Sequence, residues 1–132
     1  MSQENVQIIS SMYQAFANGD VPGVLSKLSP DVLWLEAENF IYADRNPYIG
    51  PQAVLEGVFL RIISAWNNFT VTPEEILDAG DRVVTLGIYA GTCKATGKTV
   101  RAQMVHVFTF ENEKVVKFQQ YTDTKQFADA VV

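Results

Sequence analysis

Four strand patterns follow one another in the second half of the chain, and this succession constrains the fold more than any other feature. Each pattern is a short run rich in β-branched and aromatic residues, which is typical of a β-strand. Short turns that contain Gly, Asp or Asn separate the patterns, so consecutive strands are expected to pair antiparallel. Pro73 in the first pattern cannot donate to a neighbouring strand, which predicts an edge position or a β-bulge. The expected strands cover residues 69–77, 82–93, 99–110 and 115–121.

Apolar residues at helical spacing predict two helices at the start of the chain. The first runs from about Glu4 to Ala17, where an Asn-Gly pair suits a C-terminal cap. The second is short and has Asp20 as its N-cap. We expect Leu25 and Leu28 to form the buried side of this second helix, and Ser29-Pro30-Asp31 to end it.

One strand, one loop and one long helix lie between these helices and the antiparallel meander that the four later strands are expected to form. Residues 32–36 alternate as a strand, which puts Val32, Trp34 and Glu36 on one face. Residues 37–49 lack a period, and we interpret them as a loop that serves either as a lid or as a plug of a pocket. Its aromatic anchors are Phe40, Tyr42 and Tyr48. The wide apolar arc of the helix that begins near Gly50-Pro51 predicts that this helix is mostly buried; the arc contains Val54, Leu55, Val58, Phe59, Ile62 and Ile63.

This order of elements predicts a single α+β domain over residues 1–132. We expect a curved antiparallel sheet that wraps around the N-terminal helices, and a closing helix from Thr124 to Ala130 with Asp123 as its N-cap. Several strands are apolar on both faces, as at Val83 and Val84. One face can line the core while the other packs on a second copy, so we expect a homodimer through the outer face of the sheet.

Composition excludes several classes of protein. Hydrophobic residues make up 48% of the chain and charged residues 19%, which is typical of a globular domain. The net charge of −5 argues against nucleic acid and anionic membranes as partners, because phosphates need a basic patch. No apolar run approaches the ~20 residues that span a bilayer. One histidine and one cysteine, Cys93, make a poor metal-ligand set, and a single cysteine cannot form an internal disulfide. We expect a soluble, cytoplasmic protein that uses no metal or cofactor.

The single histidine, His106, lies within the third strand of the meander. Regular alternation places it on the same face as Met104, Phe108 and Phe110. A titratable ring among apolar side chains has to be hydrogen-bonded, neutral or used for chemistry. His106 is therefore the first candidate for a functional residue.

Seven short segments, in their order along the chain, carry a family resemblance. They are Tyr13-Gln14-Ala15-Phe16-Ala17-Asn18-Gly19-Asp20, Asp31-Val32-Leu33-Trp34, Ile49-Gly50-Pro51, Gly91-Thr92, Thr96-Gly97-Lys98, His106-Val107-Phe108-Thr109-Phe110 and Tyr121-Thr122-Asp123-Thr124. With these segments the chain resembles the nuclear transport factor 2-like superfamily, and within it the SnoaL-like and ketosteroid isomerase-related enzymes. The resemblance implies a cystatin-like α+β roll with a cone-shaped pocket between the concave face of the sheet and the helices. This superfold hosts isomerases, cyclases, hydrolases, dehydratases and binding proteins, so the fold does not fix the reaction.

The resemblance also implies a set of site residues. In ketosteroid isomerase a carboxylate on the first strand moves a proton beside a carbonyl, and a tyrosine and a protonated aspartate form the oxyanion hole. The carboxylate position falls on Glu36 here, and the aspartate position falls on His106. The tyrosine position falls at or next to Met12, so Tyr13 serves only if the helix is rotated. In SnoaL-type polyketide cyclases a histidine stands at the position of His106, and their acid/base aspartate falls on Gln120.

Glu36, His106 and Gln120 are therefore expected around one cavity. Apolar neighbours raise the pKa of a carboxyl, so Glu36 could act as the base while His106 donates to a developing oxyanion. Gln120 either hydrogen-bonds His106 and fixes its tautomer, or contacts the substrate. The expected substrate-binding residues are Tyr13, Trp34, Phe59, Tyr89, Met104, Phe108, Phe118 and Gln120.

The sequence favours a cofactor-independent enzyme that transfers a proton on a small apolar carbonyl compound, as an isomerase, cyclase or dehydratase. Two alternatives stay open. The first is a non-catalytic protein that binds a hydrophobic small molecule. The second is a dimeric scaffold whose pocket is filled by side chains.

Overall fold

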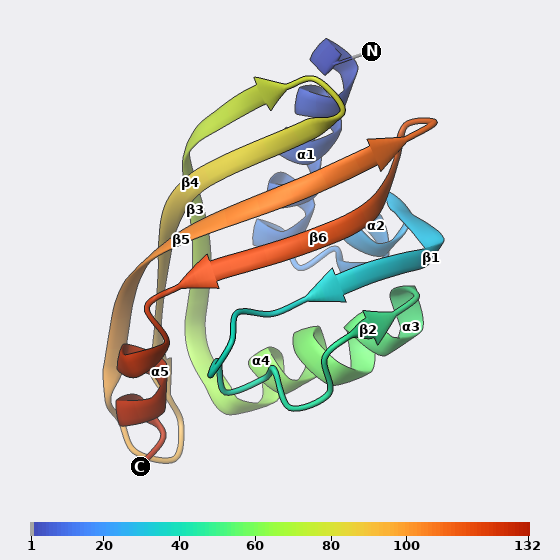
Figure 1. The fold of residues 1–132 in the computed structure, drawn as a ribbon. Helices are drawn as coiled ribbons and strands as arrows, with labels where there is room; N and C mark the ends of the chain where they lie inside the picture. The colour runs from blue at the N-terminus through green and yellow to red at the C-terminus, as the bar shows by residue number, and fades with distance from the viewer. Residues whose placement is uncertain (1) are drawn as a thin grey trace.

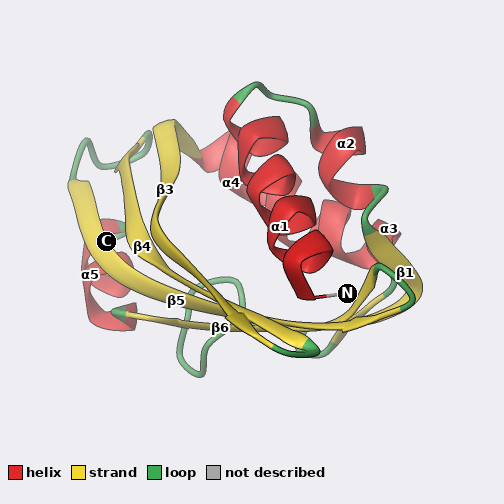
Figure 2. Cartoon of the chain, turned by 90° about the horizontal axis from the view of Figure 1, so that it is seen from above, coloured by secondary structure: helices red, strands yellow, loops and turns green. Residues whose placement is uncertain are grey.

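The computed structural model describes residues 2–132 as a curved six-stranded sheet with helices packed inside its concave face (Figures 1 and 2). Met1, the first residue of the expected domain, lies outside the described residues. The helices are α1 (Ser2–Ala17), α2 (Val21–Leu25), α3 (Pro51–Val54), the π-helical turn η1 (Leu55–Phe59), α4 (Leu60–Ala65) and α5 (Thr124–Ala130). The strands are β1 (Leu28–Leu35), β2 (Tyr48–Ile49), β3 (Trp66–Ala79), β4 (Arg82–Cys93), β5 (Thr99–Glu111) and β6 (Lys114–Thr122).

The α+β fold with N-terminal helices and a curved sheet is confirmed. The strands lie in the order β2-β1-β6-β5-β4-β3, and β3 to β6 form the expected antiparallel meander. One pair differs from an all-antiparallel sheet, because β1 lies beside β6 and runs parallel to it. This parallel pair brings the C-terminal end of β1 next to the C-terminal end of β6. Glu36 and Gln120 thereby come from neighbouring strands.

Pro73 lies on β3, at the edge of the sheet, and next to a bulge, so both alternatives for this proline hold. The pairing of β3 with β4 shifts by one residue between Pro73 and Glu75. Opposite the proline stands Gly87, where an added Cβ would lie 2.3 Å from the carbonyl oxygen of Thr72. Glycine is needed at this close approach of two backbones, and bulges increase the local bend of a sheet.

The second helix ends earlier than the sequence indicates. Asp20 caps α2, and its carboxylate accepts from the backbone N–H of Gly23 at 2.9 Å. The buried residue of α2 is Val24, whereas Leu28 already belongs to β1. The expectation that Leu25 and Leu28 form one helical face is therefore wrong. Their spacing of three also fits a turn followed by a strand.

The long helix from Pro51 to Ala65 is continuous but contains the π-helical turn η1. It is less buried than expected, because Leu60 is 47% exposed and Ile63 is 52% exposed. The extra residue of a π-turn rotates the helix that follows, and such turns are frequent at functional sites. Within η1, a Cβ added to Gly57 would lie 2.2 Å from the ring of Tyr48. The helix is thereby packed directly against the short strand β2.

The C-terminal helix α5 begins as expected. The Asp123 carboxylate accepts from the backbone N–H of Gln126 and thus caps the helix. Among residues 2–132, no helix combines the length and the apolar character needed to cross a membrane.

Candidate active site

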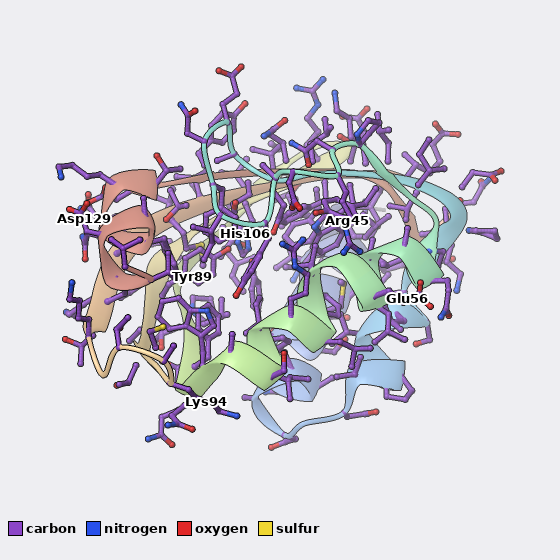
Figure 3. All side chains as sticks on the ribbon, turned by 90° about the horizontal axis from the view of Figure 1, so that it is seen from below. Arg45, Glu56, Tyr89, Lys94, His106 and Asp129 are labelled. Atoms are coloured by element: carbon purple, nitrogen blue, oxygen red, sulfur yellow. The ribbon has the colours of Figure 1, made fainter. Side chains whose placement is uncertain are left out.

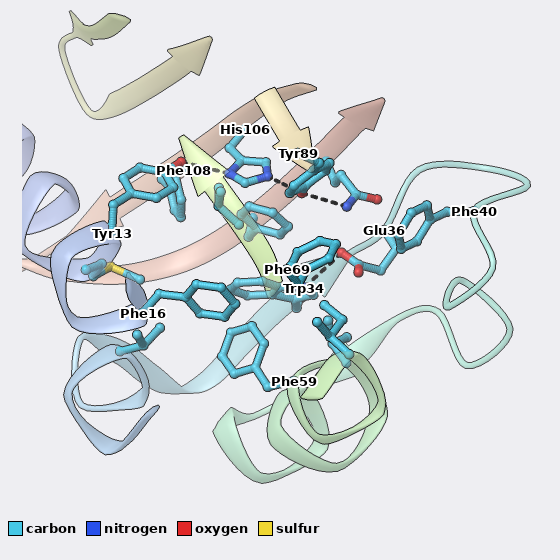
Figure 4. A pocket seen from close by; sticks show the side chains of 17 residues that line it. Tyr13, Phe16, Trp34, Glu36, Phe40, Phe59, Phe69, Tyr89, His106 and Phe108 are labelled. Carbon is cyan, nitrogen blue, oxygen red and sulfur yellow. Dashed lines mark hydrogen bonds between the residues drawn. The ribbon is translucent and has the colours of Figure 1, made fainter. Parts of the chain in front are cut away.

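A cavity of about 70 Å³ lies between the concave face of the sheet and the helices (Figure 4). Its walls are almost entirely aromatic and aliphatic, and its polar residues are Tyr13, Glu36, Tyr89, His106 and Gln120. The apolar lining residues are Met12, Phe16, Val24, Trp34, Phe40, Val58, Phe59, Ile62, Phe69, Val71, Phe108 and Phe118. In Figure 4, Tyr13 and Phe16 lie at one end of the cavity, and Glu36 and Phe40 lie at the other.

The structure brings all but one of the expected site residues to this cavity. The exception is Met104, which is buried but does not line it. Met104 pairs with Gly87 across β4 and β5, and its methyl group occupies the space that a side chain at Gly87 would take. The missing side chain therefore draws Met104 beneath the bend of β4 and away from the cavity.

The aromatic part of the wall forms one packed cluster. The indole of Trp34 stacks on the ring of Phe118 at 3.8 Å between centroids and meets Phe59 edge-on at 5.7 Å. The ring of Phe118 in turn lies 4.9 Å from the His106 ring. Rings packed in this way hold each other in fixed orientations. They give the cavity a preformed apolar surface beside its polar groups.

Glu36 directly follows β1 and is 3% exposed. Its Oε2 accepts a hydrogen bond from the indole Nε1 of Trp34 at 3.1 Å. Burial raises the pKa of Glu36 to about 8, and the Trp34 hydrogen bond offsets part of that rise. The carboxyl group is therefore mostly protonated at neutral pH and ionises about one pH unit higher.

His106 is buried and lies close to Tyr89 (Figure 3), and tyrosines engage both of its ring nitrogens (Figure 4). The hydroxyl of Tyr13 lies 2.7 Å from Nδ1, and the hydroxyl of Tyr89 lies 2.5 Å from Nε2. Burial lowers the pKa of His106 to about 3, so the ring is neutral at physiological pH. Burial also raises the pKa of both tyrosines, so their hydroxyls keep their protons.

Gln120 does not bond His106 directly, because Tyr89 stands between them. Its Nε2 donates to the hydroxyl of Tyr89 at 2.9 Å, and its Oε1 accepts from the backbone N–H of Ala37 at 3.1 Å. A continuous chain of hydrogen bonds thus runs from Tyr13 through His106, Tyr89 and Gln120 to Ala37. It ends at the residue next to Glu36.

The loop of residues 37–47 forms the wall beside Glu36, and the last two residues of the expected loop, Tyr48 and Ile49, instead form β2 because they pair with β1. Phe40 lines the cavity and packs edge-on against Phe127 of α5, with 4.9 Å between ring centroids. The Asn46 side chain accepts from the backbone N–H of Glu36 at 3.1 Å and donates to its carbonyl at 2.8 Å. Further contacts join Tyr42 to Trp66, Asp44 to Arg61, and Tyr48 to the backbone of Tyr42. The aromatic anchors of this loop are buried as expected.

The cavity comes closest to solvent between α1 and β3. The partly exposed lining residues are Tyr13 and Phe16 on α1 and Phe69 and Val71 on β3, whereas the other lining residues are buried. Figure 2 shows α1 facing β3 across the concave side of the sheet. A ligand entering with little rearrangement of the fold would pass between these two elements.

Several wall residues were not expected from the sequence. Phe16 shares the helical stripe of Tyr13, which could have indicated it. Phe69 and Val71 lie two residues apart on the same face of β3. Only the bend of the sheet turns that face toward the cavity. Phe40 reaches the wall through the path of the loop, for which the sequence carries no period. Within residues 2–132, no three His, Cys, Asp or Glu side chains form a group that could hold a metal ion.

Comparisons with known proteins place this fold in a defined class. An NTF2-like protein from Burkholderia thailandensis E264 is 30% identical, with a TM-score of 0.92 over 97% of each chain. TerC, solved as a co-crystal with polyporic acid, is 26% identical, with a TM-score of 0.85 over 97% of this chain and 98% of its own. A putative SnoaL-like polyketide cyclase from Jannaschia sp. CCS1 shares the fold at 16% identity, with a TM-score of 0.82 over 98% of this chain and 92% of its own.

These structures define an NTF2-like α+β fold. The family model of the SnoaL-like domain matches residues 9–118, and the chain belongs to this family. No curated protein matches the chain.

Proposed function

We propose that this protein is a cofactor-independent enzyme that moves a proton on a small apolar carbonyl compound, as an isomerase, cyclase or dehydratase. One observation carries the proposal. The carboxyl of Glu36 and the hydroxyl of Tyr13, which is bonded to His106, line the same apolar cavity. A proton acceptor and a hydrogen-bond donor in one water-poor site are the two groups that proton transfer beside a carbonyl requires.

The roles follow from the hydrogen bonds. Glu36 in its ionised form takes a proton from the carbon next to the carbonyl and returns it to the product. Negative charge collects on the carbonyl oxygen during this step, and Tyr13 donates a hydrogen bond to it. His106 acts as a positioning residue, because both of its nitrogens are bonded to tyrosines. The donor role that the sequence suggested for His106 is thereby assigned to Tyr13.

The size of the cavity limits the substrate. Its volume of about 70 Å³ is roughly half of the ~150 Å³ of an engineered cavity that binds benzene. Compounds of about four heavy atoms therefore suit the cavity as it stands, and a compound of six heavy atoms such as cyclopentanone requires a small displacement of α1 from β3. A larger ligand, such as the polyporic acid bound by TerC, would require α1 and β3 to move apart.

Exchange of α-protons tests this proposal without knowledge of the natural substrate. Cyclopentanone in D₂O loses its α-proton signals in NMR spectra when a base removes and returns protons. We expect the protein to accelerate this loss and Glu36→Gln to abolish the acceleration. The matched control is Glu38→Gln, the same change at an exposed carboxylate two residues away. Equal acceleration by Glu36→Gln and the unsubstituted protein would refute the proposed role of Glu36.

A specific observation favours binding without turnover as the second candidate. The carboxyl of Glu36 holds its proton at neutral pH, so it can donate a hydrogen bond to a ligand, and the hydroxyl of Tyr13 lines the same cavity. A rise in melting temperature with cyclopentanone or polyporic acid, without exchange or other conversion of the compound, would support this candidate. A ligand at a hundred times its Kd adds about 2.7 kcal/mol of stability, which such a measurement detects.

A second copy of the chain is the proposed protein partner. Apolar side chains form two cross-strand rows on the outer face of the sheet, with Leu86 opposite Val105 and Tyr121, and Val84 opposite Val107. Val105 is half-buried and Tyr121 is 56% exposed, which leaves this surface available to a self-complementary partner. Light scattering should give the mass of a dimer, and Val105→Glu should give a monomer. A monomeric unsubstituted protein would contradict this proposal.

A cytoplasmic location and the lack of nucleic-acid or membrane partners stay predictions from composition.

A further inference from the structure

The orientation of the Gln120 amide is fixed by its neighbours. The backbone N–H of Ala37 can only donate, so the atom of Gln120 that faces it at 3.1 Å is the oxygen Oε1. The other end of the amide is therefore the NH₂ group. It donates to the hydroxyl oxygen of Tyr89 at 2.9 Å.

This donation fixes the direction of the next bond. Because the Tyr89 oxygen accepts from Gln120, its own proton is free to point at Nε2 of His106, 2.5 Å away. If His106 donated instead, Tyr89 would accept twice and its buried proton would have no partner among residues 2–132. Leaving a buried donor without a partner costs about 1–3 kcal/mol. The opposite tautomer leaves the Tyr89 proton unpaired, whereas this one leaves that of Tyr13 unpaired. Tyr89 is 5% exposed and Tyr13 is partly exposed, so the cost is lower at Tyr13 and Nε2 is the acceptor.

The neutral ring of His106 carries one proton, which must then sit on Nδ1. This N–H donates to the hydroxyl oxygen of Tyr13 at 2.7 Å, and the Tyr13 proton is left without a protein acceptor in the chain of bonds. The hydroxyl of Thr85, next to Tyr13, makes no hydrogen bond among residues 2–132. Because the Thr85 hydroxyl makes no hydrogen bond within the described part of the chain, it does not take the Tyr13 proton.

We infer that Gln120, acting through Tyr89, holds His106 in the Nδ1-protonated tautomer and thereby makes Tyr13 a hydrogen-bond donor toward the cavity. Gln120 and Tyr89 are positioning residues in this account. The ligand at this end of the cavity has to offer an acceptor, such as a carbonyl or enolate oxygen. A ligand with only donors would leave the Tyr13 proton unpaired.

The tautomer of His106 does not depend on the proposed function, although the use of Tyr13 in catalysis rests on the proposed function. His106 is the single histidine of the chain, so ¹⁵N labelling of histidine gives one unambiguous pair of ring signals. Proton-coupled ¹⁵N spectra at pH 7 distinguish a protonated nitrogen from a bare one. We expect Nδ1 to be protonated and Nε2 to be bare. A protonated Nε2 in the unsubstituted protein would overturn the inference.

Two variants test whether Gln120 and Tyr89 set this state. Gln120→Met removes the donor to Tyr89, and Tyr89→Phe removes the donor to His106. Each should raise the Nε2-protonated fraction from near zero to a clearly measurable share. Gln119→Met, the neighbouring residue on β6, is the control and should leave the His106 signals unchanged. Pure Nδ1 protonation in a folded Gln120→Met or Tyr89→Phe protein would overturn the inference.

The proton-exchange assay separates the inference from the proposed function. The expected tautomer together with an absence of exchange would leave the inference standing and remove the catalytic role. Exchange with the opposite tautomer would do the reverse. Gln120→Met is also expected to lower the turnover more than it changes the KM, since it weakens a donor that acts in the transition state.

Discussion

The hydroxyl of Tyr13 lies 2.7 Å from Nδ1 of His106, although 93 positions of the sequence separate the two residues. Their rings lie nearly parallel, with 10° between the planes and 5.9 Å between the centroids. The pair joins helix α1 to strand β5 inside a cavity that is otherwise apolar. The helix is thus oriented so that Tyr13, and not Met12 beside it, carries the donor of the site.

Removing this hydroxyl is expected to impair catalysis and leave the fold intact. Loss of one oxyanion donor commonly costs about 10²–10³ in kcat, so Tyr13→Phe should lower proton exchange by a factor in that range. Tyr121→Phe removes the same atom outside the cavity, on the outer face proposed to pack against a second copy, and serves as the control. Full activity in Tyr13→Phe, with the circular dichroism unchanged, would rule out Tyr13 as the donor.

The buried carboxyl of Glu36 makes stability depend on pH in a particular direction. The folded chain holds this proton up to about pH 8, whereas an unfolded chain releases it near pH 4.5. Between these values the folded state binds more protons, so the free energy of unfolding falls as the pH rises. The slope contributed by one group is at most about 1.4 kcal/mol per pH unit.

Chemical denaturation at pH 5 and pH 8 measures this contribution. We expect the unsubstituted protein to lose stability between these two pH values. Glu36→Gln has no proton to release and should show a smaller loss. Parallel pH dependence in the two proteins would mean that Glu36 is not held protonated by burial.

His106 contributes the opposite dependence in acid. Its pKa is about 3 in the folded chain and near 6.5 in an unfolded one, so its contribution to stability is present above pH 6.5. That contribution is lost as the pH falls toward 3, because the unfolded chain binds a proton there that the folded chain does not. Denaturant titrations of His106→Gln should show a weaker decline between pH 6 and pH 4. An unchanged decline would contradict the neutral, buried ring.

Gly57 gives a stability test that does not involve the polar residues. An exposed glycine in a helix usually gains up to about 1 kcal/mol when it is replaced by alanine. Here the new Cβ would lie 2.2 Å from the Tyr48 ring, and overpacking typically costs about 1–3 kcal/mol. Gly57→Ala should therefore lower the melting temperature. A rise would mean that η1 and Tyr48 separate without cost.

The expected fold follows from local patterns that survive in the structure. The meander, the edge position of Pro73, and the helix caps Asp20 and Asp123 all depend on residues close together in sequence. The parallel pairing of β1 with β6 does not, since it joins segments about 85 residues apart. A strand pattern indicates which face of the strand is buried, but it does not indicate which other strand pairs with it.

The site shows the same division. Glu36, His106 and Gln120 were placed around one cavity by their strand positions, and they line it. Their hydrogen bonds could not be predicted, because Tyr89 enters between Gln120 and His106 through the curvature of β4. The prediction that Met104 lines the cavity was wrong for a related reason. Strand alternation indicates the face on which Met104 lies, but it does not reveal the space beside Gly87 that the Met104 side chain fills.

The most direct test of the account is the pH dependence of cyclopentanone proton exchange. If ionised Glu36 is the base, kcat/KM should rise about tenfold per pH unit below pH 8 and become constant above it. Glu36→Gln should show no catalysed exchange at any of these pH values, while Glu38→Gln should reproduce the full profile. A catalysed rate that persists in Glu36→Gln, or that does not change between pH 6 and pH 9, would contradict the account.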